Sequence, residues 1–243
     1  MKKKLLIVIP ARSGSTRVKN KNMKRLGSIP LLGHKIKSCI KSKVGRVIVS
    51  TNSRKIANYA KKIGAEVPFL RPKEYSTAKA STLSCILHLI RYFKHNRLSI
   101  PDYIAILPPT NPFLKISTIK KAYKKILSNN KFNSIVSIVK SSEHPFLIVK
   151  NKKKILFNVV KFGGFKYSDF ERTQEWPLVE IQSPAIKISK TKFFLRFVRN
   201  KSPLINGKTF DTKSCIGYKV TKKEAFDIND KYDFDIANVL VKK

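Results

Sequence analysis

Leu5-Leu-Ile-Val-Ile9 and the segment after it, Pro10-Ala-Arg-Ser-Gly-Ser-Thr-Arg-Val-Lys-Asn-Lys-Asn22, set the architecture expected of this chain. The first run is apolar and largely β-branched, and Pro10 ends it, as is typical of a buried parallel strand. The second segment is a polar loop. In an open α/β sheet, ligands bind at the carboxyl ends of the strands, which is where such a loop lies.

Helical and strand patterns alternate after this loop. Apolar residues recur at helical spacing in residues 29–42, 54–63, 81–94 and 116–128, and short apolar runs at 46–50, 103–107 and 135–139 indicate strands. The alternation predicts an α/β fold with a Rossmann-like, doubly wound and mainly parallel sheet. Near the end, the pattern predicts a strand at 185–188, a helix at 190–199 and a final helix at 233–241.

Residues 141–182 break this alternation. Two apolar runs, 146–149 and 155–160, flank the polar residues 150–154 and suggest a hairpin, and residues 161–182 have little periodicity. We expect a single domain over residues 1–243, with residues 141–182 forming a small dimerisation arm or lid.

Composition limits the classes of partner. The 243 residues are 42% hydrophobic, and no apolar run approaches the roughly 20 residues that a membrane helix needs. We therefore expect a cytoplasmic protein without a membrane partner. The formal net charge of +38 comes largely from lysines spread along the whole chain, so genomic bias is the favoured explanation. Specific nucleic-acid binding is not expected, whereas electrostatic attraction of anionic substrates stays open.

The loop after the first strand has the chemistry of an anion site. Ser13, Gly14 and Ser15 are small enough for backbone N–H groups to approach an anion. Arg12 and Lys21 supply positive charge, as do Arg17 and Lys19. The loop matches neither common phosphate-loop motif, so the residues alone allow a nucleotide-phosphate loop or a generic polar loop.

Several motifs, in order, resemble the acylneuraminate and related cytidylyltransferases. The first is the segment from Ile9 to Asn22. The later ones are Leu31-Leu-Gly-His34, Val47-Ile-Val-Ser-Thr51, Leu70-Arg-Pro72, Leu107-Pro-Pro-Thr-Asn-Pro112, Glu143-His-Pro145 and Phe226-Asp-Ile-Asn-Asp230. The similarity extends over nearly the whole chain.

The resemblance implies transfer of CMP from CTP to the anomeric hydroxyl of an acidic 2-keto sugar of the sialic-acid kind, with release of pyrophosphate. It implies catalytic roles for Arg12, Lys21 and Asp227, with Mg²⁺ held by Asp227 and Asn229. The nucleotide-binding positions that it implies are Ala11, Arg12, Ser13, Gly14, Ser15, Lys21, Asn22, Arg71, Ala80 and Thr82. Read without the family, Arg71 could instead be a surface residue before a proline turn.

The sugar side departs most from the family pattern. The usual Arg-Gln-x-Leu-Pro reads Thr173-Gln-Glu-Trp-Pro177, and Asn-Gly-Ala reads Ser183-Pro-Ala185. The candidate sugar contacts are Thr110, Asn111, Gln174 and Gln182. The resemblance also implies a homodimer. A 3-deoxy-manno-octulosonate cytidylyltransferase and a catalytically impaired nucleotide-binding homologue are the alternatives.

The metal motif departs as well, because Asn229 stands where the family has a second aspartate. In an extended segment, Asp227 and Asn229 would point to one side and Asp230 to the other. Asp233 and Asp235 are expected at the start of the final helix, where acidic side chains favour the helix dipole.

Overall fold

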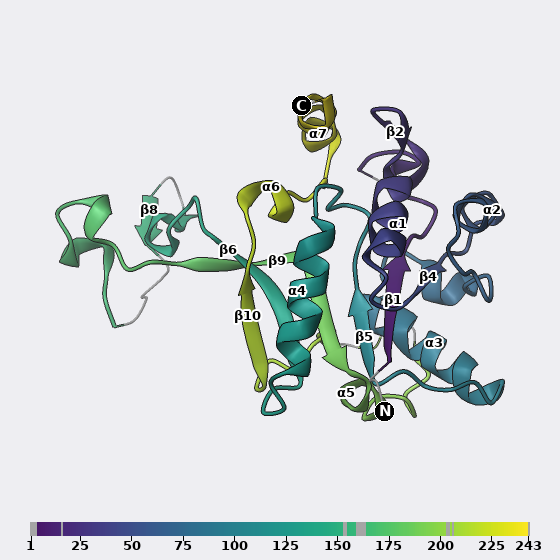
Figure 1. Cartoon of the computed structure of the whole chain (residues 1–243). Coiled ribbons are helices and arrows are strands. Elements are labelled where there is room, and N and C mark those ends of the chain that lie inside the picture. Colours follow the sequence, from purple (N-terminus) through teal and green to yellow (C-terminus); the bar gives the residue numbers. More distant parts are fainter. Residues whose placement is uncertain are drawn as a thin grey trace.

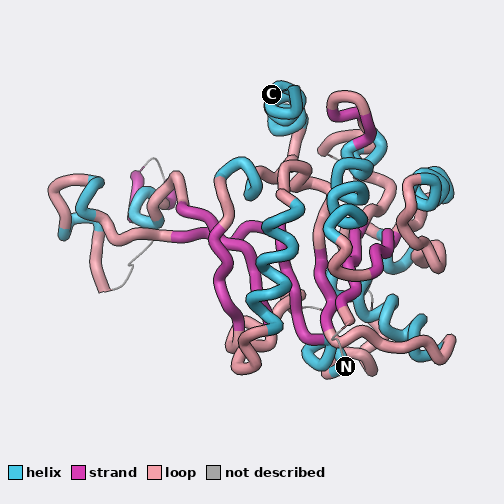
Figure 2. Tube along the Cα trace, in the orientation of Figure 1, coloured by secondary structure: helices cyan, strands magenta, loops and turns pink. Residues whose placement is uncertain are grey.

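The computed structural model describes residues 4–15, 17–152, 155–158, 164–202, 205 and 207–242. A six-stranded sheet in the order β10-β6-β9-β5-β1-β4 forms its centre (Figures 1 and 2). Its strands are β1 (Leu5–Pro10), β4 (Arg46–Ser50), β5 (Tyr103–Ile106), β6 (Ser134–Lys140), β9 (Glu180–Lys190) and β10 (Cys215–Lys219). The α/β fold and its mostly parallel sheet confirm the fold class predicted from the sequence.

Strand β9 is the exception to the parallel arrangement. Strand β1 pairs in parallel with β4 and β5, and β10 pairs in parallel with β6. In contrast, β9 lies between β5 and β6 and runs antiparallel to both. The two parallel parts of the sheet are therefore joined only through β9.

Helices cover both faces of the sheet because alternate strand residues point to opposite sides. In β1, Leu5, Ile7 and Ile9 pack into one apolar cluster, whereas Leu6 and Val8 pack into another. The first cluster contains residues of α1 (Leu31–Ser42), α2 (Arg54–Lys62) and α4 (Ile116–Leu127). The second contains residues of α3 (Thr82–His95) and α5 (Thr191–Leu195).

The carboxyl end of the sheet carries smaller elements. The loop after β1 contains the 3-10 helix η1 (Lys21–Met23) and leads into the short strands β2 (Arg25–Leu26) and β3 (Ile29–Pro30). Near the C-terminus, α6 (Lys222–Ala225) and α7 (Lys231–Lys242) lie at the same end, opposite the N-terminus (Figure 1). Phe234 and Ala237 of α7 pack in a third apolar cluster with Leu26 and Leu31.

The segment between β6 and β9 projects from the body as an arm, defined as residues 141–179 (Figure 1). It contains the hairpin of β7 (Val149–Lys152) and β8 (Ile155–Asn158) and the 3-10 helices η3 (Pro145–Leu147), η4 (Tyr167–Asp169) and η5 (Thr173–Glu175). The expected hairpin exists, but its first strand begins at Val149 and includes part of the polar run. Residues 153–154 and 159–163 lie outside the described residues.

Two expectations were wrong in detail. Strand β9 covers 11 residues, although only 185–188 were predicted, and α5 ends at Leu195 rather than near 199. Residues 226–229 form no strand. Within the described part of the chain, no helix has the length and apolar character needed to cross a membrane.

Candidate active site

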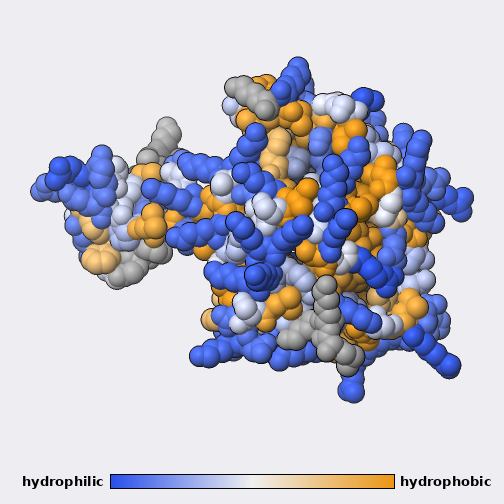
Figure 3. Space-filling view, in the orientation of Figure 1, coloured by the Kyte–Doolittle hydropathy of each residue, from blue (hydrophilic) through white to orange (hydrophobic). Residues whose placement is uncertain are grey.

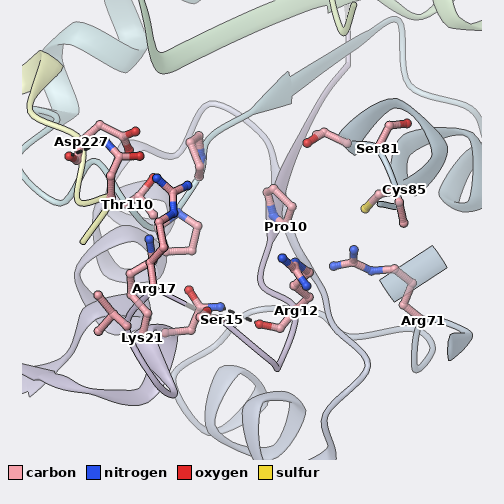
Figure 4. Close-up of a pocket in the computed structure, with 17 residues that line it drawn as sticks. Pro10, Arg12, Ser15, Arg17, Lys21, Arg71, Ser81, Cys85, Thr110 and Asp227 are labelled. Atoms are coloured by element: carbon pink, nitrogen blue, oxygen red, sulfur yellow. Dashed lines mark hydrogen bonds between the residues drawn. The ribbon is translucent and has the colours of Figure 1, made fainter. Parts of the chain in front are cut away.

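A cavity of about 390 Å³ opens at the carboxyl ends of β1 and β5 (Figure 4). Among the described residues, its charged lining consists of the cationic side chains of Arg12, Arg17, Lys21 and Arg71 and the carboxylate of Asp227. The positive groups therefore outnumber the negative group by four to one. Such a lining favours a ligand with several negative charges, such as a nucleoside triphosphate.

The shape of the loop after β1 is fixed by its own side chains and by β4. The Ala11 N–H donates to the Ser50 carbonyl at 2.9 Å, and the Asn22 amide donates to the Arg12 carbonyl at 2.9 Å. The Ser13 N–H donates to Asn52 Oδ1 at 2.8 Å. These bonds hold the loop in place before any ligand arrives.

Gly14 allows the turn in this loop, because its φ of 78° is one that other residues adopt at a cost. A second cavity, of about 300 Å³, contains Ser13 and Gly14 on the other side of the loop and shares Arg12, Ser15 and Asn22 with the first. Ala11 is fully buried behind the loop. Each predicted phosphate-side residue therefore lines one of these two cavities, except Ala11, which supports the loop.

Lys21 connects the loop to the C-terminal part of the site. Its ammonium donates to the Ile228 carbonyl at 2.6 Å, across 207 residues of sequence. Burial lowers the pKa of Lys21, and the carboxylate of Asp227 acts in the opposite direction. The lysine therefore lies where it can contact both a phosphate and the segment that contains Asp227.

Arg71 is buried, with 6% of its surface exposed, so its alternative interpretation as a surface residue was wrong. Its Nη2 donates to the Ser50 carbonyl at 2.5 Å and its Nη1 to the Tyr75 carbonyl at 3.3 Å. Its buried Nε has no hydrogen-bond partner among the described residues. A planar donor fixed in this way can recognise the edge of a base.

The N-terminus of α3 forms the wall of the cavity beside Arg71. Ala80, Ser81 and Thr82 line the cavity, and the Ser81 hydroxyl caps the helix by accepting the Ser84 N–H at 3.0 Å. Figure 4 shows Ser81 and Arg71 on the same side of the cavity, away from Asp227. The cavity thus has two walls, with the loop from Arg12 to Asn22 between them. We call the wall with Arg71 the base-side wall, after the role expected of Arg71, and the wall with Asp227 the carboxylate-side wall.

Asp227 and Asn229 line the carboxylate-side wall, and Ile228 between them is fully buried. The Ile228 N–H donates to the Thr110 carbonyl at 2.9 Å. This contact anchors the irregular segment, in which both candidate metal ligands line the cavity and the residue between them is buried. One carboxylate oxygen of Asp227, Oδ1, is buried and has no hydrogen-bond partner among the described residues.

These groups fit a hard divalent cation that also binds phosphate oxygens. A buried, unpartnered carboxylate oxygen is a suitable ligand for Mg²⁺, and the Asn229 side chain adds a carbonyl oxygen. The Asn229 amide nitrogen donates to the Asp227 backbone carbonyl at 3.2 Å, so its amide is oriented within this segment. No group of three or more His, Cys, Asp or Glu residues able to hold a metal occurs within the described ranges. Phosphate and water would have to complete the coordination.

The neighbouring aspartates have a structural role. The Asp233 N–H donates to Asp230 Oδ1 at 3.0 Å, and Asp233 Oδ2 accepts from the Asn229 and Asp230 N–H groups at 2.8 and 3.3 Å. They cap the N-terminus of α7, as expected for Asp233.

The four candidate sugar contacts do not converge. Thr110 lines the main cavity, whereas Gln174 is exposed in the arm and Gln182 lines another cavity beside β9. Asn111 is fully buried, and its Nδ2 donates to the carbonyls of Ala225 and Phe226 at 3.2 and 2.9 Å. Asn111 therefore holds the segment before Asp227 and does not offer its amide group to the cavity, which corrects its expected role.

Lys35 supports this same region and was missed in the sequence. It is fully buried on α1, and its ammonium donates to the Asn111 carbonyl at 2.6 Å. Burial lowers its pKa to about 8, against the opposing effects of Cys39 and Asp227. One sequence pattern could have indicated its burial. Lys35 lies three residues after Leu32 and four before Cys39, on the apolar face of the helix.

Comparison with known proteins agrees with the chemistry of the cavity. Across its full length the chain is 30% identical to an N-acylneuraminate cytidylyltransferase from Escherichia coli and covers 53% of that protein. Over 121 residues it is 36% identical to a CMP-N,N'-diacetyllegionaminic acid synthase from Legionella pneumophila and covers 51% of it. The chain thus spans about half the length of the Escherichia coli relative, whereas 49% of the chain aligns with 51% of the Legionella pneumophila relative.

Solved structures share the fold. A CMP:2-keto-3-deoxy-manno-octonic acid synthetase, complexed with CTP, superposes with a TM-score of 0.71 at 11% identity, and 98% of each chain is covered. A cytidylyltransferase from Leptospira borgpetersenii superposes with a TM-score of 0.59 at 16% sequence identity. The superposition covers 99% of this chain and 87% of the Leptospira chain. At these sequence identities, the structural similarity shows only that the fold is shared.

A family model described as cytidylyltransferase matches residues 6–158, more than half of the chain and the part that contains the loop from Arg12 to Asn22. This chain therefore belongs to the cytidylyltransferase family.

Proposed function

We propose that the protein transfers CMP from CTP to the anomeric hydroxyl of an acidic 2-keto sugar of the sialic-acid class and releases pyrophosphate. The observation that carries this proposal is the cavity lined by one carboxylate and four cationic side chains, three of which come from a loop held by its own hydrogen bonds. The names of the relatives from Escherichia coli and Legionella pneumophila support a nonulosonate acceptor.

In the proposed reaction, the anomeric oxygen attacks the α-phosphorus of CTP. A bond forms between these two atoms, the bond from the α-phosphorus to the bridging oxygen of the β-phosphate breaks, and pyrophosphate leaves. Arg12 and Lys21 stabilise the negative charge that develops on the phosphates. Arg71 and the N-terminus of α3 hold the cytosine on the base-side wall.

Asp227 Oδ1 and the Asn229 carbonyl oxygen are the protein ligands proposed for Mg²⁺. When bound, the ion would neutralise charge on the leaving pyrophosphate. Asn229 brings no charge, so we expect a site that needs millimolar Mg²⁺. Loss of this charge is also what favours the second candidate function, a nucleotide-binding protein with impaired catalysis.

CTP with Mg²⁺ should stabilise the folded protein more than ATP, GTP or UTP does. A ligand at 100 times its dissociation constant adds about 2.7 kcal/mol to the free energy of unfolding, or roughly 5–10 °C in melting temperature. A thermal-shift panel of the four nucleotides, with and without Mg²⁺, measures this. The control is Lys37→Ala, at an exposed position on α1, which should leave the shift unchanged. Equal shifts with all four nucleotides would contradict a cytosine-reading pocket.

We further propose a homodimer that forms through the arm. Several large apolar side chains of the arm are exposed, among them Leu147 at 49%, Ile148 at 52% and Leu178 at 64%. Figure 3 shows apolar surface on the projecting arm between hydrophilic regions. Exposed apolar side chains on a projecting segment are typical of protein contacts. The proposal also places the reaction in the cytoplasm.

Leu178→Asp should convert the dimer to a monomer, because it places a charge in the apolar contact. Sedimentation velocity at micromolar concentrations measures the change in mass. Val239→Asp is the control, since Val239 is comparably exposed, at 59%, but lies on α7. A Leu178→Asp protein with the wild-type mass would remove the arm from the interface.

A further inference from the structure

A cavity of about 300 Å³ adjoins the nucleotide cavity on the far side of Thr82, which lines both. Its other lining residues include Gln182, Lys187, Lys208, Thr209 and Phe210. No acidic residue of the described chain lines it. Two ammonium groups without a counter-charge make this cavity selective for an anion.

Lys187 occupies an unusual position for a lysine. It lies in β9, opposite Ile106 of β5 and Val136 of β6, in the middle of the sheet and partly buried. No hydrogen bond or ion pair joins its ammonium to another described residue. Its three N–H donors are therefore free to bind an anion that enters the cavity.

Lys208 brings a second positive charge to the same place. The Nζ atoms of Lys187 and Lys208 lie 5.9 and 5.8 Å from the centroid of the Phe210 ring. Burial lowers the pKa of Lys187, Lys208 lowers it further, and Asp227 acts in the opposite direction.

The connection between the two cavities is built into the chain. Ile106, the register partner of Lys187, is the last residue of β5, and Pro108 to Thr110, which follow it closely, line the nucleotide cavity. An anion beside Lys187 would therefore lie next to bound nucleotide. It would be separate from the triphosphate, whose charge the loop from Arg12 to Lys21 can match.

We propose that Lys187 and Lys208 bind the carboxylate of the acceptor sugar, and that the cavity around them is the acceptor's site. This inference rests on the proposed function, and it identifies the group by which the acceptor is recognised. If the carboxylate binds here, the acceptor needs its acidic group in order to bind to the enzyme. It also gives Gln182 a role as a neighbouring hydrogen-bond donor.

Titration calorimetry with N-acetylneuraminate and its methyl ester tests the inference without turnover. Wild type should bind the free acid, and Lys187→Met should weaken this binding at least tenfold. Lys208→Met should weaken it less, because its ammonium is exposed. The uncharged ester should bind weakly to all three proteins. Lys192→Met, at an exposed position just after β9, should bind the acid as wild type does.

Steady-state kinetics with CTP and Mg²⁺ provides the second readout. Lys187→Met should raise the KM for the acidic sugar at least tenfold and leave the KM for CTP within twofold. Unchanged sugar affinity in both lysine variants, or equal affinity of wild type for acid and ester, would overturn the inference. If wild type binds the sugar but does not bind CTP, the proposed function is contradicted. The carboxylate site would still be supported in that case. The melting temperature of each variant verifies that it is folded.

Discussion

Asp227→Asn is expected to lower the rate of pyrophosphate release by roughly 1,000-fold or more. Asp227 is the only carboxylate in the described lining of the nucleotide cavity, and its Oδ1 is buried without a hydrogen-bond partner. The substitution keeps the shape of the side chain but removes the charge, which leaves two neutral amides at the proposed Mg²⁺ site. The remaining ligands would then come from phosphate and water alone.

The measurement is a Mg²⁺ titration of pyrophosphate release for wild type, Asp227→Asn and Asn229→Asp. Wild type should need millimolar Mg²⁺, and Asn229→Asp should need less, because a second carboxylate strengthens a site for a hard cation. Asp235→Asn is the matched control, since Asp235 is exposed on α7. Full activity of Asp227→Asn would remove this residue from the mechanism. Absence of turnover by wild type with every acidic sugar would favour the impaired nucleotide-binding homologue.

Lys21→Ala and Arg12→Ala should each lower kcat/KM by about 100-fold or more, because each removes a fixed cation from the phosphates in the transition state. Both side chains line the cavity, and the loop between them is held by hydrogen bonds that need no ligand. Initial rates over a range of CTP concentrations, at saturating sugar, give kcat/KM.

The two variants should differ in one respect. Lys21 also donates to the Ile228 carbonyl, so Lys21→Ala should additionally raise the Mg²⁺ requirement, whereas Arg12→Ala should not. Lys41→Ala, on the exposed side of α1, serves as the control. Values within a few-fold of wild type for both Lys21→Ala and Arg12→Ala would exclude the loop as the phosphate site.

Local sequence patterns predicted the elements that form from contiguous residues. The strands β1, β4 and β5 and the helices α1 to α4 lie where apolar periodicity places them, since the same periodicity buries one side of each element. Strand β9 was underestimated because Ser183-Pro184 interrupts its pattern. Its antiparallel direction depends on neighbours more than 40 residues away in the sequence, which no local pattern records.

The same distinction applies to the site. Arg12, Lys21 and Asn22 could be proposed as site residues because one loop contains them all. The segment with Asp227 was proposed by resemblance, although its shape depends on a bond to Thr110 more than 100 residues away. Lys35 and Lys187 were missed because their burial depends on packing against distant residues. Only for Lys35 did the sequence carry a sign of this, in the apolar spacing of α1. Asn111 was misassigned because its partners, Ala225 and Phe226, lie far along the chain.

The insertion of β9 between β5 and β6 determines when the sheet can be completed during synthesis. When the ribosome has made the first 140 residues, β5 and β6 exist but have no strand to join them, because each pairs with β9 on the facing edge. Both edges stay open until residues 180–190 emerge, after the whole arm has been made. Unpaired strand edges invite association with other chains, and long-range pairing slows folding. The nascent chain therefore passes through a stage at which its N-terminal half exposes strand edges that are prone to aggregation.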